Sequence, residues 1–247
     1  MAGLKLRYVL DDLRPLAAGR VLDVGCGSGT MAKAIKRERP DLDVHGVDFS
    51  ATTIATATRH SEGVTFAQAP AEALPFADGW CDAVTMFDVL EHVDDPGRVL
   101  SEIARVLKPG GLFHLVLPLE AQPRTIYTLI GCGTRWKAKV KYAGHIQIYS
   151  DSRYRGEAVR AGLPVRSVRW SYHYMTSLID VAFFSIVSRT GPLKTSVEDA
   201  TDQSRGWVRV PGKLAKSLVA SIGWYESRAL SRLTGACGHY LCIRDSG

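Results

Sequence analysis

The sequence predicts an α/β fold built around a parallel, doubly wound sheet. In the first half of the chain, short apolar segments typical of strands alternate with segments of helical periodicity. The first of these strands runs directly into a glycine-rich loop, "GCGSG". Of the 247 residues, 46% are hydrophobic and 23% are charged, so the chain can build a proper core. Strands that alternate with helices at this spacing favour a parallel sheet.

The first two strands are expected at 21–24 and 43–47. A helix follows the first strand through "TMAKAIKRE" and ends before Pro40. After the second strand, Ser50 takes the N-cap position of a helix through "ATTIATATRH". A serine hydroxyl at that position accepts a hydrogen bond from an N–H group of the first helical turn.

Three further strands are expected at 64–67, 82–87 and 112–117. The loop "APAEALPFADGW" connects the first two of them. Between the last two, "DPGRVLSEIARVL" places apolar residues three and four apart, which predicts a helix that ends before Pro109 and two glycines.

The second half of the chain is less regular. Residues 118–144 are expected to form an insertion with one or two helices, followed by a helix at 150–162 and a strand at 165–172. The segment "MTSLIDVAFFSIVSR" predicts an apolar helix, which packs in the core, forms a lid over an apolar substrate or faces a membrane. The remaining expected elements are an exposed loop through "TGPLKTSVEDATDQSRG", a helix through "GKLAKSLVASIGWYESRALSRLTG" and a last strand through "GHYLCIR".

We expect no signal peptide, membrane span or disulfide framework from this sequence. The N-terminal "MAGLKLRYVLDDLRPL" carries charges where a signal peptide needs an apolar stretch, so we expect a short helix that packs on the core. The apolar runs end well before the roughly 18 residues that span a bilayer. Five cysteines without a C-x-x-C pair predict neither a metal site nor a disulfide framework. These features predict a cytoplasmic protein with free thiols.

The net charge of +6 is concentrated in one segment. Between Ala121 and Trp170, ten basic residues are opposed only by Asp151 and Glu157. Three interpretations are open: a solvated face, a surface for an anionic substrate group or an anionic membrane, and a nucleic-acid footprint. The segment "RWKAKVKY" interleaves aromatic and basic residues as single-strand binders do, although no separate RNA-binding module is evident.

Two carboxylates flank the glycine-rich loop and indicate which nucleotide it holds. The loop has glycines at 25, 27 and 29, whereas the dinucleotide fingerprint would place its third glycine where Thr30 stands. Asp23 precedes the loop and would repel a pyrophosphate but attract an ammonium group. Asp48 ends the second strand, where an acidic side chain can accept the ribose hydroxyls. The pattern therefore favours S-adenosylmethionine over NAD.

From Arg20 to Leu117 the chain resembles the class I S-adenosylmethionine-dependent methyltransferases, in particular the group that acts on small molecules and quinone-like lipids. The resemblance is carried by "VLDVGCGSGT", "VHGVDFS", "EALPFADGWCDAV", "FDVLEHVDDP" and "RVLKPGGLFHLVLP". It implies a Rossmann-like, doubly wound sheet of seven strands with the last one antiparallel. We expect one methyltransferase domain over 1–247, with a core at 20–117, 150–172 and 236–245. Insertions at about 118–150 and 173–232 would form a helical cap.

The resemblance also implies which residues contact the cofactor. Asp23 and the loop would hold the methionine end, Asp48 the ribose, and Phe49 would pack against the adenine. One position departs from the family, because Pro70 stands where an acidic residue usually accepts the adenine amino group. Losing that hydrogen bond costs only about 0.5–1.5 kcal/mol. The implied cofactor-binding residues are Asp23, Gly25, Gly27, Gly29, Asp48, Phe49, Ala71, Glu72, Phe87 and Asp88.

Methyl transfer would proceed by in-line displacement, and a base is needed only where the acceptor must lose a proton. The candidate bases are His145 first, then His92 and His173, while Glu91 and His92 are equally suited to orienting their loop. His145 and Tyr149 are also expected to contact the substrate.

For the acceptor we favour a small, largely apolar molecule, such as a polyketide, terpenoid or quinone-like compound with an anionic or phenolic group, as in natural-product biosynthesis. Peripheral membrane contact is an accompanying expectation. The alternatives are an RNA methyltransferase that uses the basic residues of 121–170, and a non-catalytic S-adenosylmethionine-binding protein.

Overall fold

The computed structural model describes residues 2–132, 135, 137–190 and 221–245. The chain divides into two compact units. We call the unit of Ala2–Pro118, Asp151–Arg169 and Gly238–Gly247 the sheet unit, and the unit of Leu119–Ser150 and Trp170–Cys237 the second unit. The loop expected in "TGPLKTSVEDATDQSRG" and the first part of the helix expected after it lie outside the described residues.

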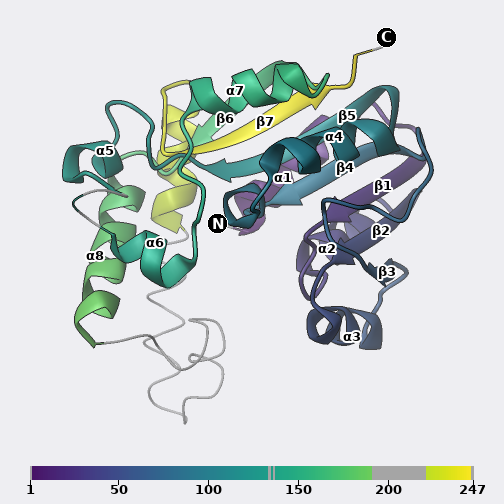
Figure 1. Ribbon diagram of the computed structural model, residues 1–247, viewed down its shortest axis with the longest axis horizontal. Coiled ribbons are helices and arrows are strands. Elements are labelled where there is room, and N and C mark those ends of the chain that lie inside the picture. Colours follow the sequence, from purple (N-terminus) through teal and green to yellow (C-terminus); the bar gives the residue numbers. More distant parts are fainter. Residues whose placement is uncertain (1, 133–134, 136, 191–220, 246–247) are drawn as a thin grey trace. The chain divides into compact units, whose positions relative to one another are not determined.

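The strands form one seven-stranded sheet in the order β3-β2-β1-β4-β5-β7-β6 (Figure 1). The five strands from β3 to β5 pair in parallel. Strand β7 is antiparallel to its neighbours, which confirms the predicted fold class. The strands are β1 Gly19–Val24, β2 Leu42–Asp48, β3 Thr65–Gln68, β4 Cys81–Phe87, β5 Leu107–Pro118, β6 Val165–Ser171 and β7 Cys237–Ile243.

The strand order creates a switch point at the centre of the sheet. Strand β1 lies between β2 and β4, so the chain leaves β1 toward one edge of the sheet and later returns to its other side. In open α/β sheets the loops diverge at such a point and leave a crevice at the carboxyl ends of the strands. The glycine-rich loop follows β1 at this end.

The helices of the sheet unit bury their apolar faces on the strands. Helices α1 and α2 share a core cluster, to which they contribute Val9, Leu13, Ala32 and Ile35. The predicted N-terminal helix therefore packs on the core. Helices α4 and α7 contact each other. The helices are α1 Ala2–Leu13, α2 Thr30–Glu38, α3 Ala51–Arg59, α4 Pro96–Val106 and α7 Asp151–Arg160, with a 3-10 turn η1 at Leu90–His92.

One boundary differs from the sequence prediction. We expected the helix before β5 to be separated from it by Pro109 and two glycines, with the strand starting at 112. Instead α4 ends at Val106 and β5 begins at Leu107, which pairs with Cys81. The register of the β4–β5 pairing shifts between Cys81 and Ala83. The proline and the two glycines lie at this irregularity and belong to β5.

The second unit contains α5 Ile126–Ile130, α6 Ala138–Ala143, α8 Met175–Thr190 and further helical residues at 221–230. Its core includes Tyr127, Cys132 and Ala236. The apolar helix predicted from "MTSLIDVAFFSIVSR" is confirmed as α8. That this unit caps an acceptor site stays a prediction.

Within the described part of the chain, we find no helix whose length and apolar character would let it cross a bilayer. All five cysteines are free thiols.

Candidate functional site

The glycine-rich loop needs its glycines for two physical reasons. Gly25, Gly27 and Gly29 have φ values of 73°, 53° and 82°, in the left-handed region that favours glycine. A Cβ at Gly25 would lie 2.3 Å from Cγ2 of Val89, and one at Gly29 would lie 2.4 Å from Cζ of Phe66. Any larger residue at these two positions would displace a packed side chain.

The backbone donors of this loop are directed at the neighbouring strand. The N–H groups of Gly25 and Cys26 both donate to the carbonyl oxygen of Val47, at 2.8 and 2.9 Å. The N–H of Gly27 donates to Oδ2 of Asp48 at 2.9 Å. Loops that hold a pyrophosphate leave such donors free for phosphate oxygens. The hydrogen bonding therefore argues against a dinucleotide, as the sequence pattern did.

Asp48 stands at the carboxyl end of β2 with 9% of its surface exposed. Its Oδ1 accepts from the N–H of Ser50 at 2.9 Å and from Oγ1 of Thr53 at 3.2 Å. With the bond from Gly27, three of the roughly four lone-pair positions of a carboxylate are used. The position that is left can accept a hydroxyl of a bound ligand.

Asp23 has different surroundings from those expected. Its Oδ1 accepts from Oγ1 of Thr85 at 2.8 Å, and its carboxyl also accepts from the backbone of Ala32 in α2. The side chain is buried, and this burial raises the pKa of Asp23 to about 7. Asp23 joins β1 to β4 and to α2, and its predicted contact with the methionine end of the cofactor stays untested.

A cavity of about 350 Å³ lies beside the loop, within the sheet unit. Five of the predicted cofactor residues line it, and so does Pro70 at the departure from the family. Phe49 is 77% exposed, so its ring is available to a flat ligand. The lining residues are Gly25, Asp48, Phe49, Ala69, Pro70, Ala71, Glu72, Val89, His92, Val93 and Asp94.

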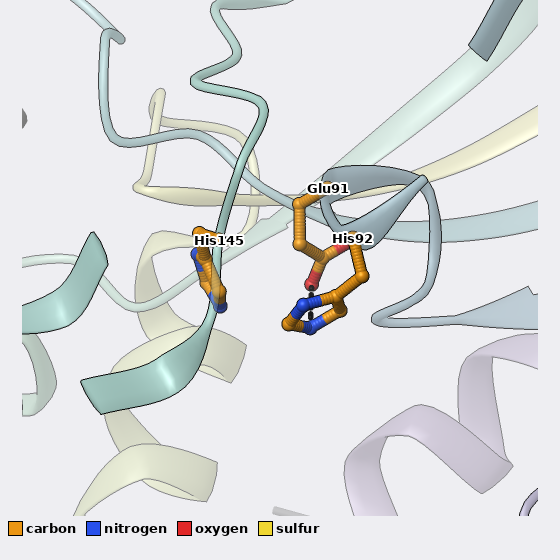
Figure 2. A group of neighbouring side chains, drawn as sticks. All are labelled: Glu91, His92 and His145. Atoms are coloured by element: carbon orange, nitrogen blue, oxygen red, sulfur yellow. Dashed lines mark ion pairs between the residues drawn. The ribbon is translucent and has the colours of Figure 1, made fainter. Parts of the chain in front are cut away.

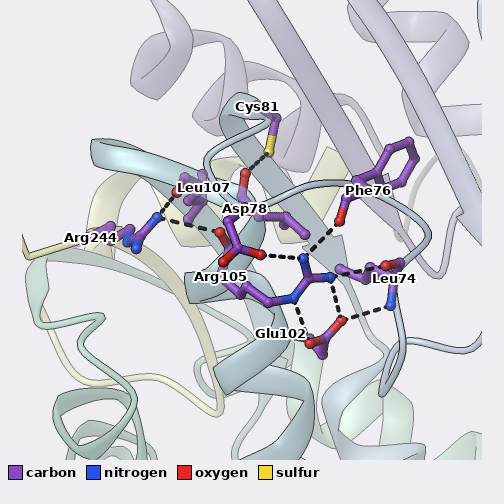
Figure 3. Close-up of polar contacts among 9 residues, drawn as sticks. Leu74, Phe76, Asp78, Cys81, Glu102, Arg105, Leu107 and Arg244 are labelled. Carbon is purple, nitrogen blue, oxygen red and sulfur yellow. Dashed lines mark hydrogen bonds and ion pairs between the residues drawn. The ribbon is translucent and has the colours of Figure 1, made fainter.

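Helix α4 fastens the loop that supplies one wall of this cavity (Figure 3). The guanidinium of Arg105 donates to the carbonyl oxygens of Leu74 and Phe76, at 3.0 and 2.7 Å. It also forms a two-point pair with Glu102, with both distances 2.8 Å. Glu102 in turn accepts the N–H of Leu74 at 2.9 Å. The sequence analysis missed this clamp, although the i,i+3 spacing of Glu102 and Arg105 on one helix face was a signal for it.

Phe87 and Asp88 end β4 and do not line the cavity. Phe87 packs against the core cluster of α1 and α2. Asp88 has a φ of 54° and forms an ion pair with Lys5 of α1. Its backbone N–H donates to Val116 at 3.1 Å. In this structure Asp88 ties the N-terminal helix to the end of β4, and its cofactor contact stays a prediction.

The three candidate histidines have different hydrogen-bond or ion-pair partners. His92 lines the cavity, its side chain is 39% exposed, and its Nε2 lies 3.8 Å from Oε1 of the buried Glu91 (Figure 2). His145 belongs to the second unit and pairs through Nδ1 with Glu120 at 2.6 Å. His173, in the same unit, has its Nε2 2.9 Å from the carbonyl oxygen of Leu233. Of the three candidate histidines, His92 is the one among the residues that line the described cavity.

Tyr149 is fully buried within the second unit. Its carbonyl oxygen accepts the N–H of Ala121 at 2.8 Å. The substrate contacts expected of Tyr149 and His145 stay predictions.

Residues 22–115 match the model of a methyltransferase domain family. A ubiquinone/menaquinone biosynthesis C-methyltransferase of Desulfotalea psychrophila is 39% identical over 107 residues, which cover 42% of this chain and 44% of that protein. A ubiquinone biosynthesis O-methyltransferase of Pectobacterium atrosepticum is 40% identical over 113 residues, 44% of this chain and 46% of that protein. The chain thus spans less than half the length of these relatives.

Solved structures share the fold over nearly the whole chain. The YcgJ protein of Bacillus subtilis has a TM-score of 0.62 at 19% identity, covering 99% of this chain and 100% of that one. A geranyl diphosphate methyltransferase bound to sinefungin has a TM-score of 0.62 at 18% identity, covering 99% and 78%. The [4+2]-cyclase SpnF has a TM-score of 0.63 at 21% identity, covering 100% and 81%. Residues 22–115 therefore match a methyltransferase domain, and the chain shares its fold with proteins described as methyltransferases, one of which is bound to sinefungin.

Proposed function

We propose that this protein transfers the methyl group of S-adenosylmethionine to a small, largely apolar acceptor. The observation that carries the proposal is the cavity of about 350 Å³ at the carboxyl ends of β1 and β2. One wall is the glycine-rich loop, another is Asp48 with its remaining acceptor position, and Phe49 offers an exposed ring. These groups match the amino acid, ribose and adenine parts of the cofactor in turn.

The charge of the cavity suits a cationic ligand. Asp48, Glu72 and Asp94 place carboxyl groups in its lining, and no lysine or arginine lines it. A cleft lined by one sign of charge concentrates ligands of the opposite sign. S-adenosylmethionine carries an ammonium and a sulfonium and has no phosphate, so its charge fits this lining and that of a dinucleotide does not.

Recognition of the adenine would rely on a backbone hydrogen bond and on apolar packing. Pro70 has no N–H and no side-chain acceptor, so it supplies only an apolar surface. The N–H of Ala71 lies in the same wall and can donate to a ring nitrogen. The clamp from Arg105 and Glu102 holds the continuation of this segment at Leu74.

When bound, S-adenosylmethionine supplies an activated methyl group on its sulfonium. The chain then has to align an acceptor atom behind that methyl group and exclude water, which accounts for much of the rate enhancement in such displacements. His92 is positioned to take a proton from an acceptor hydroxyl, because it lines the cavity and Glu91 lies beside its Nε2. For acceptors that need no deprotonation, the same residue serves only as part of the wall.

An apolar acceptor is favoured by two observations. The curated relatives act in ubiquinone and menaquinone biosynthesis, which supports a quinone-like compound. The basic residues of the segment at 121–170 are also opposed by one carboxylate from outside it, Asp12, in addition to its own Asp151 and Glu157. Arg153 and Arg155 pair with Glu157 and Asp151, both at 2.9 Å, and Arg169 pairs with Asp12 at 2.5 Å. Neutralised arginines weaken the case for an RNA substrate. An apolar acceptor partitions into bilayers, so peripheral membrane contact is part of the same proposal.

The experiment separates binding from methyl transfer. Calorimetry should detect binding of S-adenosylmethionine and no binding of NAD. Incubation with S-adenosylmethionine and a panel of hydroxyquinones, phenols and prenyl compounds should add one methyl group to an acceptor, and mass spectrometry detects the methylated product. Because the fold is shared with a [4+2]-cyclase, cofactor binding alone does not establish methyl transfer, and binding without any methylated product would overturn the methyltransferase proposal. Methylation of RNA but of no small molecule would contradict the proposed acceptor class and support the RNA alternative.

A further inference from the structure

The second unit carries most of the exposed apolar side chains of the described chain. Of the nine large hydrophobic residues that are exposed, seven belong to this unit. Single exposed hydrophobic residues are ordinary on protein surfaces, whereas a contiguous group marks an interaction site. The question is therefore whether these residues lie together.

Five of them belong to chain segments that hydrogen bonds join at the start of α8. The N–H groups of Tyr174 and Met175 donate to Oε1 of Glu226, at 2.8 and 2.6 Å, which places the helical residues 221–230 at this end of α8. Tyr225 is the neighbour of Glu226 in the chain. Leu233 joins them because its carbonyl oxygen lies 2.9 Å from Nε2 of His173.

Leu178 of α8 completes the group. Its N–H donates to the carbonyl oxygen of Tyr174 at 2.9 Å and it follows Met175 by three residues, so the three residues lie within one turn at the start of α8. The five residues are between 50% and 67% exposed. We call Tyr174, Met175, Leu178, Tyr225 and Leu233 the α8 patch.

Among the described residues of the second unit, exposed positive charge accompanies this patch and no acidic side chain is exposed. Arg228 and Arg232 are exposed and lie in the same chain segment as Tyr225 and Leu233. The acidic residues described in the second unit are engaged within it: Glu226 caps α8, Asp180 accepts from the hydroxyl of Tyr127, and Glu120 pairs with His145. None of the three is in the exposed class. In the part of the unit that the structure describes, the patch therefore combines exposed apolar residues with two exposed arginines.

We propose that the α8 patch docks on the surface of a bilayer that contains anionic phospholipids. Tyrosines with an apolar ring and a polar hydroxyl settle at the level of the headgroups. Aliphatic side chains such as Leu178 enter the acyl boundary, and arginines attract anionic headgroups. The proposal deepens the proposed function, since an apolar acceptor would be collected from such a membrane. The binding itself requires neither cofactor nor acceptor.

The test is co-flotation of the full chain with vesicles. We expect binding to phosphatidylcholine vesicles that contain roughly one third phosphatidylglycerol, little binding to phosphatidylcholine alone, and weaker binding as salt is raised above about 0.1 M. Replacing Arg228→Gln and Arg232→Gln should weaken partitioning by roughly 30-fold, because each basic residue near an anionic surface contributes about fivefold. The matched control is Arg59→Gln with Arg166→Gln, which removes the same charge from exposed positions of the sheet unit.

Two further variants test how much the apolar side chains contribute to vesicle binding. Leu178→Gln should reduce binding to anionic vesicles, whereas Val159→Gln, at a 61% exposed position of α7, should not. Quenching of tryptophan fluorescence by lipids brominated in their acyl chains provides a measurement on the unmodified protein, because Trp224 lies beside Arg228.

Absence of binding to anionic vesicles would overturn the docking proposal, as would binding that the patch variants leave unchanged. A dimer that Leu178→Gln dissociates would show that a second copy of the chain covers the patch instead. Because the vesicle assay contains no methyl donor, failure of methyl transfer would leave its result intact, and the two proposals fail separately.

Discussion

The backbone N–H of Gly27 donates to Oδ2 of Asp48 at 2.9 Å, so the loop after β1 is fastened to the end of β2. We expect Asp48→Asn to weaken binding of S-adenosylmethionine by roughly 10- to 100-fold, because a hydrogen bond to a charged group is worth about 1.5–3 kcal/mol. Calorimetry measures the change. Asp43→Asn is the control, since Asp43 lies on the same strand with its side chain 61% exposed. Equal affinity in the two variants would place the ribose elsewhere.

Gly25 and Gly27 differ in what a side chain would meet, and this difference can be measured. A Cβ at Gly25 would lie 2.3 Å from Val89, whereas a Cβ at Gly27 has no atom within 4 Å. Both residues have positive φ, so each alanine variant carries a backbone cost of about 1 kcal/mol. We expect Gly25→Ala to reduce the free energy of unfolding and cofactor affinity more than Gly27→Ala does. Adding Val89→Ala should recover part of the loss in Gly25→Ala only. Equal losses in the two single variants would show that steric overlap with Val89 is not decisive.

Asp23 should make stability depend on pH in an unusual direction. Its folded pKa of about 7 lies above the ordinary value of 3.8, so the folded protein holds this proton more tightly than the unfolded chain. The stabilisation is complete below about pH 4 and is lost as the pH rises to about 7, amounting to about 4 kcal/mol over the interval.

Urea denaturation of the protein and of Asp23→Asn at several pH values tests this expectation. Asparagine does not titrate, so the stability of the protein relative to the variant should fall between pH 4 and 7 and level off above pH 7. A constant difference across this range would contradict the raised pKa.

Arg105 and Glu102 should affect the cofactor without touching it. Arg105→Lys keeps the charge but loses the planar two-point pair with Glu102 and at least one carbonyl contact. We expect the free energy of unfolding to fall by about 1–3 kcal/mol and the affinity for S-adenosylmethionine to fall as the loop at 69–80 loosens. Arg37→Lys, at an exposed ion pair, should change stability much less, because solvent screens such pairs. Loss of stability with unchanged affinity in folded Arg105→Lys would assign the clamp a purely structural role.

His92 should influence turnover more than binding. For an acceptor that must lose a proton, His92→Gln should lower kcat by roughly 10²- to 10⁴-fold, the range for general base catalysis, and leave cofactor affinity nearly unchanged. His60→Gln is the control, because His60 is exposed outside the cavity. An unchanged kcat, or an equal loss in both variants, would remove His92 as the base.

Much of the fold follows from local patterns in the sequence. The strand and helix periodicities, the N-cap at Ser50 and the glycines after β1 depend on residues close together in the chain, so their elements could be predicted. The start of β5 at Leu107 could not, because it depends on pairing with Cys81, 26 positions earlier. The clamp of Arg105 on Leu74 and Phe76 is likewise invisible to short-range patterns, since its partners lie 31 and 29 residues away.

Asp23 and Asp48 show the same division at the candidate site. The sequence by itself determined that two carboxylates flank a glycine-rich loop, and with it the class of cofactor, because the signs of charge and the glycine spacing are local properties. Only the tertiary structure decided that Asp48 lines the cavity while Asp23 is buried against Thr85. Whether a strand-end side chain faces a ligand or a neighbouring strand depends on which strand lies beside it, and β4 reaches β1 from 57 residues along the chain.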